Sequence, residues 1–206
     1  SERSRGLGDV YKRQPMNLEK MHVMVDRACK DIAGVSASQV EMQSGIQFYD
    51  GITTDEIQEI LIKSASDLIS LDQPNYQFVA ARLLLFSIRK SLYGKIFEIP
   101  SLLDHIQRCV ESGVYDPAVN DKFSAEEIQE IGKFLDHDRD LLFTYAGLRQ
   151  VADKYLVQDR SSGQVYETPQ FMYMLIAMTM FAEYPAETRL NYIRRYYDAI
   201  SRHKIN

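Results

Sequence analysis

Apolar residues recur at steps of three and four along most of this chain, and that spacing most constrains its fold. The first such stretch runs from residue 17 to about residue 32, with Asn17 as a suitable N-cap. Side chains spaced in this way share one face of a helix, which a core can bury. The apolar face of this predicted helix comprises Leu18, Met21, Val25, Ala28 and Ile32.

Helix-start and helix-stop signals place further helices in the first half of the chain. Thr53 and Glu56 form a capping box ahead of an apolar stripe that extends to Leu68. Gly94 is positioned to end a helix over residues 78–92, and residues 36–48 predict a shorter helix. We therefore expect four helices before a linker at residues 94–100.

The second half continues the helical pattern, with one exception. Ser124 and Glu127 form another capping box, and Thr168 with Pro169 is expected to cap and open a helix over residues 170–183. Residues 101–112 and 186–202 predict two more helices. Residues 155–157 and 164–166 flank a turn at residues 159–163 and predict a β-hairpin. The expected fold class is mainly α with this one hairpin.

Composition limits the environment and the partners. The longest weakly polar run, residues 171–182, is shorter than the roughly 20 residues that span a bilayer, so no membrane segment is expected. Cys29 and Cys109 are too few for a disulfide framework, which favours a reducing, cytoplasmic location. A net charge of −5 gives no general attraction for nucleic acid or anionic lipid. A bound anion therefore needs a local site.

Residues 1–14 lack the periodicity of the rest of the chain. They contain no apolar central region, so a targeting peptide explains them poorly. We interpret them as a non-native tail that resembles a translated sequencing adapter, and a natural flexible tail is the alternative.

Four residues at predicted helix ends suggest a nucleotide site: Asn17, Lys20, Thr54 and Lys90. A helix N-terminus offers free N–H groups and positive potential, and a lysine adds a point charge. Together they can hold a triphosphate. The same residue types are also ordinary caps and ordinary dipole compensation at helix ends, so the pattern alone leaves both interpretations open.

Several longer runs resemble the large subunit of class I ribonucleoside-diphosphate reductase. In the first half they are residues 17–20, 40–41, 46–51, 65–69 and 76–83, which resemble its ATP-cone. In the second half they are residues 135–140, 154–158, 184–185, 187–189 and 197–199. The resemblance covers residues 16–206, nearly the whole chain.

The resemblance implies a four-helix ATP-cone over residues 15–94, followed by a helical segment over residues 95–206. In the family the cone binds ATP or dATP as an allosteric effector, and Asn17, Lys20, Thr54 and Lys90 match its nucleotide-binding positions. The parent enzyme reduces ribonucleoside diphosphates to deoxyribonucleotides for DNA synthesis. Its partners are a small radical-bearing (beta) subunit, further copies of the large subunit, and thioredoxin or glutaredoxin as reductant.

Two departures from the family pattern lead to further expectations. Residues 10–13 mimic the family's opening strand, but too few residues separate them from Asn17, so the β cap of the cone is expected to be truncated. The family's catalytic cysteines lie in a barrel that follows the position of residue 206. We therefore expect a regulatory fragment with no catalytic residues and no metal of its own.

Two other functions remain as alternatives. A free-standing ATP-cone regulator would carry a zinc ribbon with paired cysteines, and no such pair occurs here. The adjacent His137 and Asp138 resemble the metal-binding pair of all-helical HD-type phosphohydrolases, which need further His and Asp ligands. In the structural alternative, Asp136 and Asp138 instead cap a helix that starts near Arg139.

Overall fold

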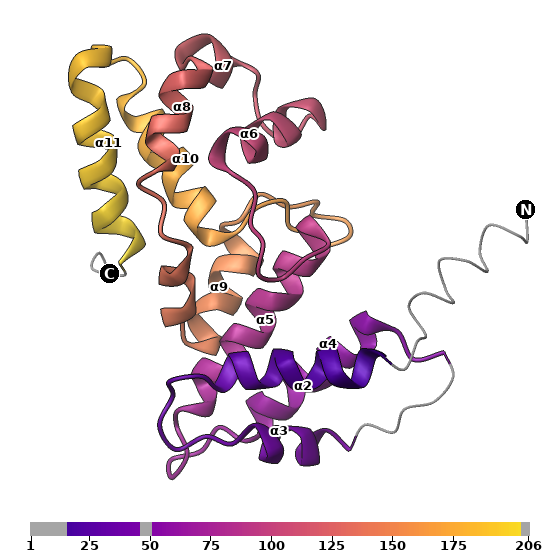
Figure 1. The fold of residues 1–206 in the computed structure, drawn as a ribbon. Helices are drawn as coiled ribbons and strands as arrows, with labels where there is room; N and C mark the ends of the chain where they lie inside the picture. Colours follow the sequence, from indigo (N-terminus) through magenta and orange to yellow (C-terminus); the bar gives the residue numbers. More distant parts are fainter. Residues whose placement is uncertain (1–15, 46–50, 203–206) are drawn as a thin grey trace, which may run out of the picture. The chain divides into compact units, whose positions relative to one another are not determined.

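The structure is a computed structural model that describes residues 16–45 and 51–202, without the side chains of Met16 and Asn17. The described chain is helical and its loops contain no strand, which confirms the mainly α fold class. It divides into two compact units (Figure 1). One comprises the residues up to Ser87 with Phe143–Arg149, and the other comprises Ile88–Leu142 with the residues from Gln150 onward. The expected β cap and the tail at residues 1–14 lie outside the described residues.

The first unit contains α2 (Met16–Cys29), α3 (Ala37–Ser44), α4 (Thr54–Asp67) and the first part of α5 (Tyr76–Tyr93). Thr53 is confirmed as the N-cap of α4, because its hydroxyl accepts a hydrogen bond from the Glu56 amide at 3.1 Å. α3 ends earlier than expected, where Gly45 adopts a left-handed conformation with φ of 55°. Fully buried side chains from all four helices form the core, including Val25, Val40, Leu61 and Val79.

Three connections fix the helix directions in this unit. The Tyr76 hydroxyl accepts from the Ser36 amide and donates to the Gln39 side chain, at 3.1 and 2.7 Å. The Asn75 amide donates to the Ala33 carbonyl at 2.9 Å. The end of α2 and the starts of α3 and α5 therefore meet at one end of the bundle. Residues 68–75 join α4 to α5 at that end, so α2 and α4 run parallel (Figure 1).

The second unit contains α6 (Leu102–Glu111), α7 (Ala118–Lys122), α8 (Ala125–Gly132), the 3-10 helix η1 (His137–Leu142), α10 (Pro169–Phe181) and α11 (Ala186–Ser201). It also holds the last part of α5 and of α9 (Tyr145–Lys154). α10 supplies the centre of the core, and α6, α8 and α11 pack around it. The core includes Leu102, Ile106, Ile128, Ile131, Phe171, Met174, Ala177, Met178, Ile193 and Tyr197.

Two local expectations in this unit need correction. Thr168 occupies the N-cap position of α10, but its buried hydroxyl makes no capping hydrogen bond. The predicted β-hairpin is reduced to a single antiparallel bridge between Gln158 and Val165. Strand pairing does not extend beyond this bridge, because the two amides that would continue it have other acceptors. The Tyr155 amide donates to a carbonyl of α9, and the Val157 amide donates to the Glu167 carboxylate at 2.9 Å.

No helix among the described residues is long and apolar enough to cross a membrane.

Arg189 joins four parts of the second unit. The residue is 8% exposed, and its guanidinium forms a bidentate ion pair with Glu127 of α8. It also donates to the carbonyls of Ala182 and Lys122, and it lies 4.2 Å from the centre of the Phe123 ring. A buried guanidinium with this many partners tethers α11 to α8 and to the ends of α7 and α10.

We predict that Arg189→Ala lowers the free energy of unfolding of this unit by about 3 kcal/mol, because it removes a buried guanidinium and leaves the half-buried Glu127 carboxylate without its partner. Urea denaturation followed by circular dichroism measures the change. Lys122→Ala is the matched control, since it breaks only the exposed pair with Glu183 at 2.8 Å and should change stability little. Equal effects of the two substitutions would contradict the role of Arg189 as a tether.

Candidate functional site

The N-terminal ends of α2 and α4 lie at the same end of the first unit, because the two helices run parallel. The Gln58 amide nitrogen contacts the Met24 sulfur at 4.0 Å. Lys20 precedes Met24 by one helical turn, and Thr54 precedes Gln58 by one turn. Lys20 and Thr54 therefore lie at the same level along the bundle, although they are far apart in the sequence.

The charges around these two residues suit a ligand with a neutral hydrogen-bonding part and an anionic part. Lys20 is exposed, and Thr54 is half-buried as the first residue of α4. Free N–H groups at the start of a helix attract anions, but Asp55 and Glu56 already supply negative charge in the first turn of α4. Thr54 is thus better suited to a neutral hydrogen-bonding group than to a phosphate, whereas Lys20 suits an anion.

The other two predicted site residues are placed differently. Asn17 lies within the first turn of α2 rather than before it, and its side chain is outside the described part of the structure. Lys90 belongs to the part of α5 in the second unit, and its ammonium donates to the Gly94 carbonyl at 2.9 Å. That contact satisfies one of the free carbonyls at the end of α5. The nucleotide-binding roles of all four residues remain predictions.

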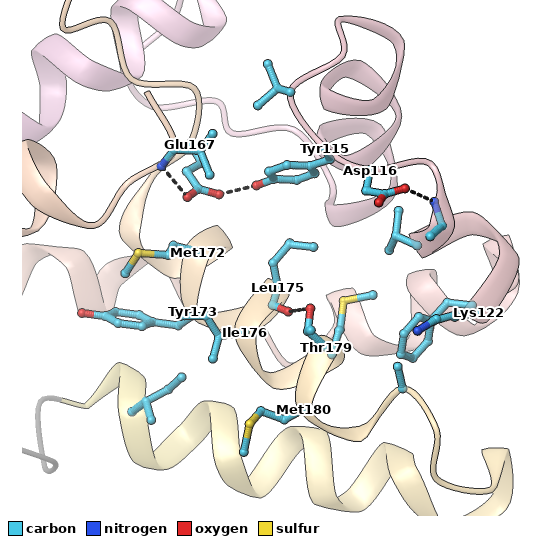
Figure 2. Close-up of a pocket in the computed structure, with 18 of the residues that line it drawn as sticks. Tyr115, Asp116, Lys122, Glu167, Met172, Tyr173, Leu175, Ile176, Thr179 and Met180 are labelled. Atoms are coloured by element: carbon cyan, nitrogen blue, oxygen red, sulfur yellow. Dashed lines mark hydrogen bonds between the residues drawn. The ribbon is translucent and has the colours of Figure 1, made fainter. Parts of the chain in front are cut away.

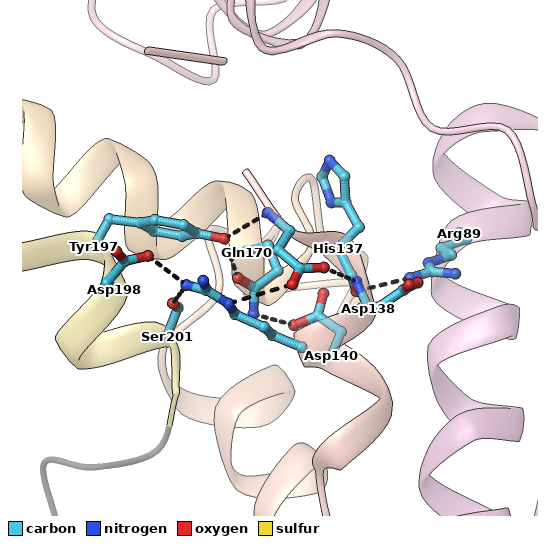
Figure 3. Close-up of polar contacts among 10 residues, drawn as sticks. Arg89, His137, Asp138, Asp140, Gln170, Tyr197, Asp198 and Ser201 are labelled. Carbon is cyan, nitrogen blue, oxygen red and sulfur yellow. Dashed lines mark hydrogen bonds and ion pairs between the residues drawn. The ribbon is translucent and has the colours of Figure 1, made fainter. Parts of the chain in front are cut away.

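A polar network in the second unit surrounds the residues that suggested a metal site (Figure 3). Gln170 of α10 donates to the Asp140 carboxylate at 2.8 Å and accepts from the Tyr197 hydroxyl. That hydroxyl in turn accepts from the Asp136 amide at 3.0 Å. The network links η1 to α10 and α11. No local sequence pattern indicates this network, because its members are distant in the chain.

Asp140 is the most unusual member of this network. Its side chain is 2% exposed, and its second carboxylate oxygen has no hydrogen-bond partner. Burial raises the pKa of Asp140 to about 7, although the Gln170 hydrogen bond and the nearby positive charge of Arg89 oppose the shift. Asp140 is therefore partly protonated near neutral pH.

The surroundings of His137 favour its neutral form. Its ring meets the Phe171 ring edge-on at 4.9 Å between centres. Burial, helped by the positive charge of Arg89, lowers the pKa of His137 to about 4. The described residues contain no group of three or more His, Cys, Asp or Glu side chains that could hold a metal ion. The Asp136 side chain accepts from the Asp138 amide at 3.1 Å, as expected of a cap. The expectation for Asp138 was wrong, because the helix is the 3-10 helix η1, which begins at His137 rather than near Arg139 and contains Asp138 in its first turn.

Comparison with known protein families covers both halves of the chain. Residues 11–91 match the ATP cone domain family, and residues 141–206 match the family described as ribonucleotide reductase, all-alpha domain. The chain is 50% identical over 191 residues to the ribonucleoside-diphosphate reductase 1 subunit alpha of Escherichia coli strain K12, which covers 93% of this chain and 25% of that protein.

The chain belongs to the family of class I ribonucleoside-diphosphate reductase alpha subunits. The alpha subunit of Haemophilus influenzae is 47% identical over 193 residues, covering 94% of this chain and 25% of that protein. The alpha subunit of Enterobacteria phage T4 is 46% identical over 175 residues, which cover 84% of this chain and 23% of that protein. The chain thus spans about a quarter of the length of these relatives and corresponds to their N-terminal region.

This assignment confirms the resemblance inferred from the sequence. A free-standing ATP-cone regulator does not account for the match of residues 141–206 to a reductase domain. A phosphohydrolase does not account for either match, and the described residues place no further His, Cys, Asp or Glu ligands with His137 and Asp138.

We predict that Asp140→Asn changes how stability depends on pH. Folded Asp140 retains its proton up to about pH 7, whereas an unfolded aspartate loses it near pH 3.9. The contribution of Asp140 to the free energy of unfolding is therefore fully present below about pH 4 and is lost as the pH rises toward 7. Asparagine cannot ionise, so it avoids this loss.

Urea unfolding at pH 4.5 and pH 8 tests this prediction. Relative to the wild type, the free energy of unfolding of Asp140→Asn should rise by about 3 kcal/mol between the two pH values. The exposed Asp138→Asn is the control and should show a constant difference. A constant difference for Asp140→Asn as well would show that the buried carboxyl titrates normally.

Proposed function

We propose that this chain forms the nucleotide-sensing region of a reductase large subunit and binds ATP or dATP as an allosteric effector. The observation that carries the proposal is the match of residues 11–91 to the ATP cone domain family. The parallel α2 and α4, with Lys20 and Thr54 at one level, support it.

In this proposal the adenine and the phosphates are recognised by different residues. Thr54 supplies a hydroxyl at a half-buried helix start and contacts the adenine. Lys20 and Asn17 lie in the first turns of α2, where the lysine charge offsets the single acidic residue, Glu19, and the free amides attract phosphate. Lys90 is directed toward the phosphates, and nucleotide binding then competes with its contact to the Gly94 carbonyl.

The activity of the whole enzyme is part of the same proposal. The alpha subunit reduces ribonucleoside diphosphates to deoxyribonucleotides, with electrons from thioredoxin or glutaredoxin and a radical from the small beta subunit. The residues of this chain contribute regulation rather than catalysis. A nucleotide at the cone changes activity only if it binds two quaternary states of the large subunit with unequal affinity, and that inequality sets the coupling energy.

Calorimetric titration of the 206-residue chain with ATP and dATP tests nucleotide binding. We predict that Thr54→Ala and Lys90→Ala each weaken binding about tenfold or more, because each removes a polar contact to the nucleotide.

The adjacent residue provides a matched control. Thr53→Ala removes the cap of α4, which costs about 1 kcal/mol of stability, yet it should leave nucleotide affinity within about twofold. Lys63→Ala, which breaks an exposed pair with Asp67 on the same helix, controls for loss of a lysine charge. Equal affinity of the wild type and both site variants would remove Thr54 and Lys90 from the site.

A further inference from the structure

Two buried polar atoms of opposite character lack a hydrogen-bond partner among the described residues of the second unit (Figure 3). One is the second carboxylate oxygen of Asp140, on η1, and the other is the Nε–H of Arg89, on the last part of α5. Asp140 is 2% exposed and Arg89 is 5% exposed, so bulk water satisfies neither group. A buried acceptor and a buried donor that both lack a partner favour pairing with each other.

Arg89 already contacts the helix that carries Asp140. Its guanidinium donates to the His137 carbonyl in a long hydrogen bond of 3.4 Å. In a 3-10 helix each carbonyl points toward the residue three positions later, and residues three apart share one face. Asp140 is three residues after His137, so the guanidinium and the carboxyl belong to the same turn of η1. Burial lowers the pKa of Arg89, and the negative charge of Asp140 opposes that shift.

A second buried carboxyl in this unit shows how such a group is satisfied when it has two partners (Figure 2). Glu167 is also 2% exposed, but one of its oxygens accepts from the Tyr115 hydroxyl and the other accepts from the Val157 amide at 2.9 Å. Asp140 accepts from the Gln170 amide through one oxygen, at 2.8 Å. The charged form of Asp140 therefore needs a donor that its present contacts do not supply.

The other groups around this pair leave Arg89 as the available cation among the described residues. Arg139 of η1 is engaged elsewhere, because it donates to Asp198 and Ser201 of α11 at 2.9 and 2.6 Å. The remaining titratable and polar side chains near the pair are acidic or neutral at pH 7. They are Tyr93 of α5, Asp136, His137 and Asp138 of η1, Gln170 and Tyr173 of α10, and Tyr197 of α11.

We propose that Arg89 and Asp140 form a latch that a proton controls. When the Asp140 carboxyl gives its proton to solvent, the Nε–H of Arg89 donates to the second carboxylate oxygen, and the ion pair ties the end of α5 to η1. When the carboxyl is protonated, this pair is broken and Arg89 stays on the His137 carbonyl. Arg89 keeps its positive charge in both states.

The latch determines whether α5 joins the polar network. Asp140 is connected to Tyr197 of α11 through Gln170, so the closed latch links α5, η1, α10 and α11 in one chain of hydrogen bonds. Burial raises the pKa of Asp140 to about 7. The latch is therefore open in mildly acidic solution and closed in mildly alkaline solution, with the change centred near neutral pH.

Crystal structures of the 206-residue chain at pH 5.5 and pH 8.5 test the geometry without any substitution. At pH 8.5 the Arg89 Nε should lie within hydrogen-bond distance of the second Asp140 oxygen, about 2.7–2.9 Å. At pH 5.5 that contact should be absent. The same position of Arg89 at both pH values, or a water molecule between the two groups at both, would overturn the proposal.

NMR titration measures the coupling in solution. The 15Nε signal of Arg89, assigned by its loss in Arg89→Lys, is followed from pH 5 to pH 9 by 13C-detected spectra. It should shift with a midpoint near pH 7 in the wild type, together with the Asp140 carboxyl carbon. In Asp140→Asn, which keeps the shape of the side chain but cannot ionise, the shift near pH 7 should be lost.

The exposed Asp138 provides the matched control, because it is the other acid whose charge acts on Arg89. Asp138→Asn should retain the Arg89 shift with a midpoint within about half a pH unit of the wild type. An Arg89 signal that follows Asp138 instead, or that still titrates near pH 7 in Asp140→Asn, would overturn the latch. Neither experiment uses a nucleotide, so its outcome is independent of effector binding at the cone.

Discussion

Burial of α10 is the constraint on which the second unit depends. A helix of 13 residues without charge is stable in water only if other helices cover it, and α6, α8 and α11 do so on its core side. These helices must keep their positions if they are to cover α10. Arg189 holds one end of α11 in place by donating to Glu127 and to two backbone carbonyls, because a buried guanidinium must satisfy its donors.

The same burial explains why polar residues near α10 are organised as a network. Gln170, in the first turn of α10, is fully buried and needs partners for its amide. Asp140 and Tyr197 provide them from η1 and α11, so the network fixes the position of α10 relative to both elements. The His-Asp pair that resembles a metal motif therefore lies beside a structural network, and only the spatial partners distinguish the two interpretations.

The sequence predicted the parts of this structure that depend on local chemistry. The caps at Thr53 and Ser124 act as local patterns require, because a hydroxyl three residues before an amide reaches it directly. The hairpin prediction was wrong because Glu167 takes the Val157 amide, a contact that no propensity encodes. At the candidate site, the sequence indicated Lys20 and Thr54 separately, but only the contact between Met24 and Gln58 places them at one level.

The central claim is that residues of this chain regulate a reductase by binding an adenine nucleotide. The most direct measurement replaces the matching N-terminal quarter of the Escherichia coli alpha subunit with this chain and follows ribonucleoside diphosphate reduction as ATP and dATP are varied. The account predicts a rate that changes with nucleotide, and a smaller change when Thr54→Ala is present. An active chimera whose response to both nucleotides is the same with and without Thr54→Ala would contradict it.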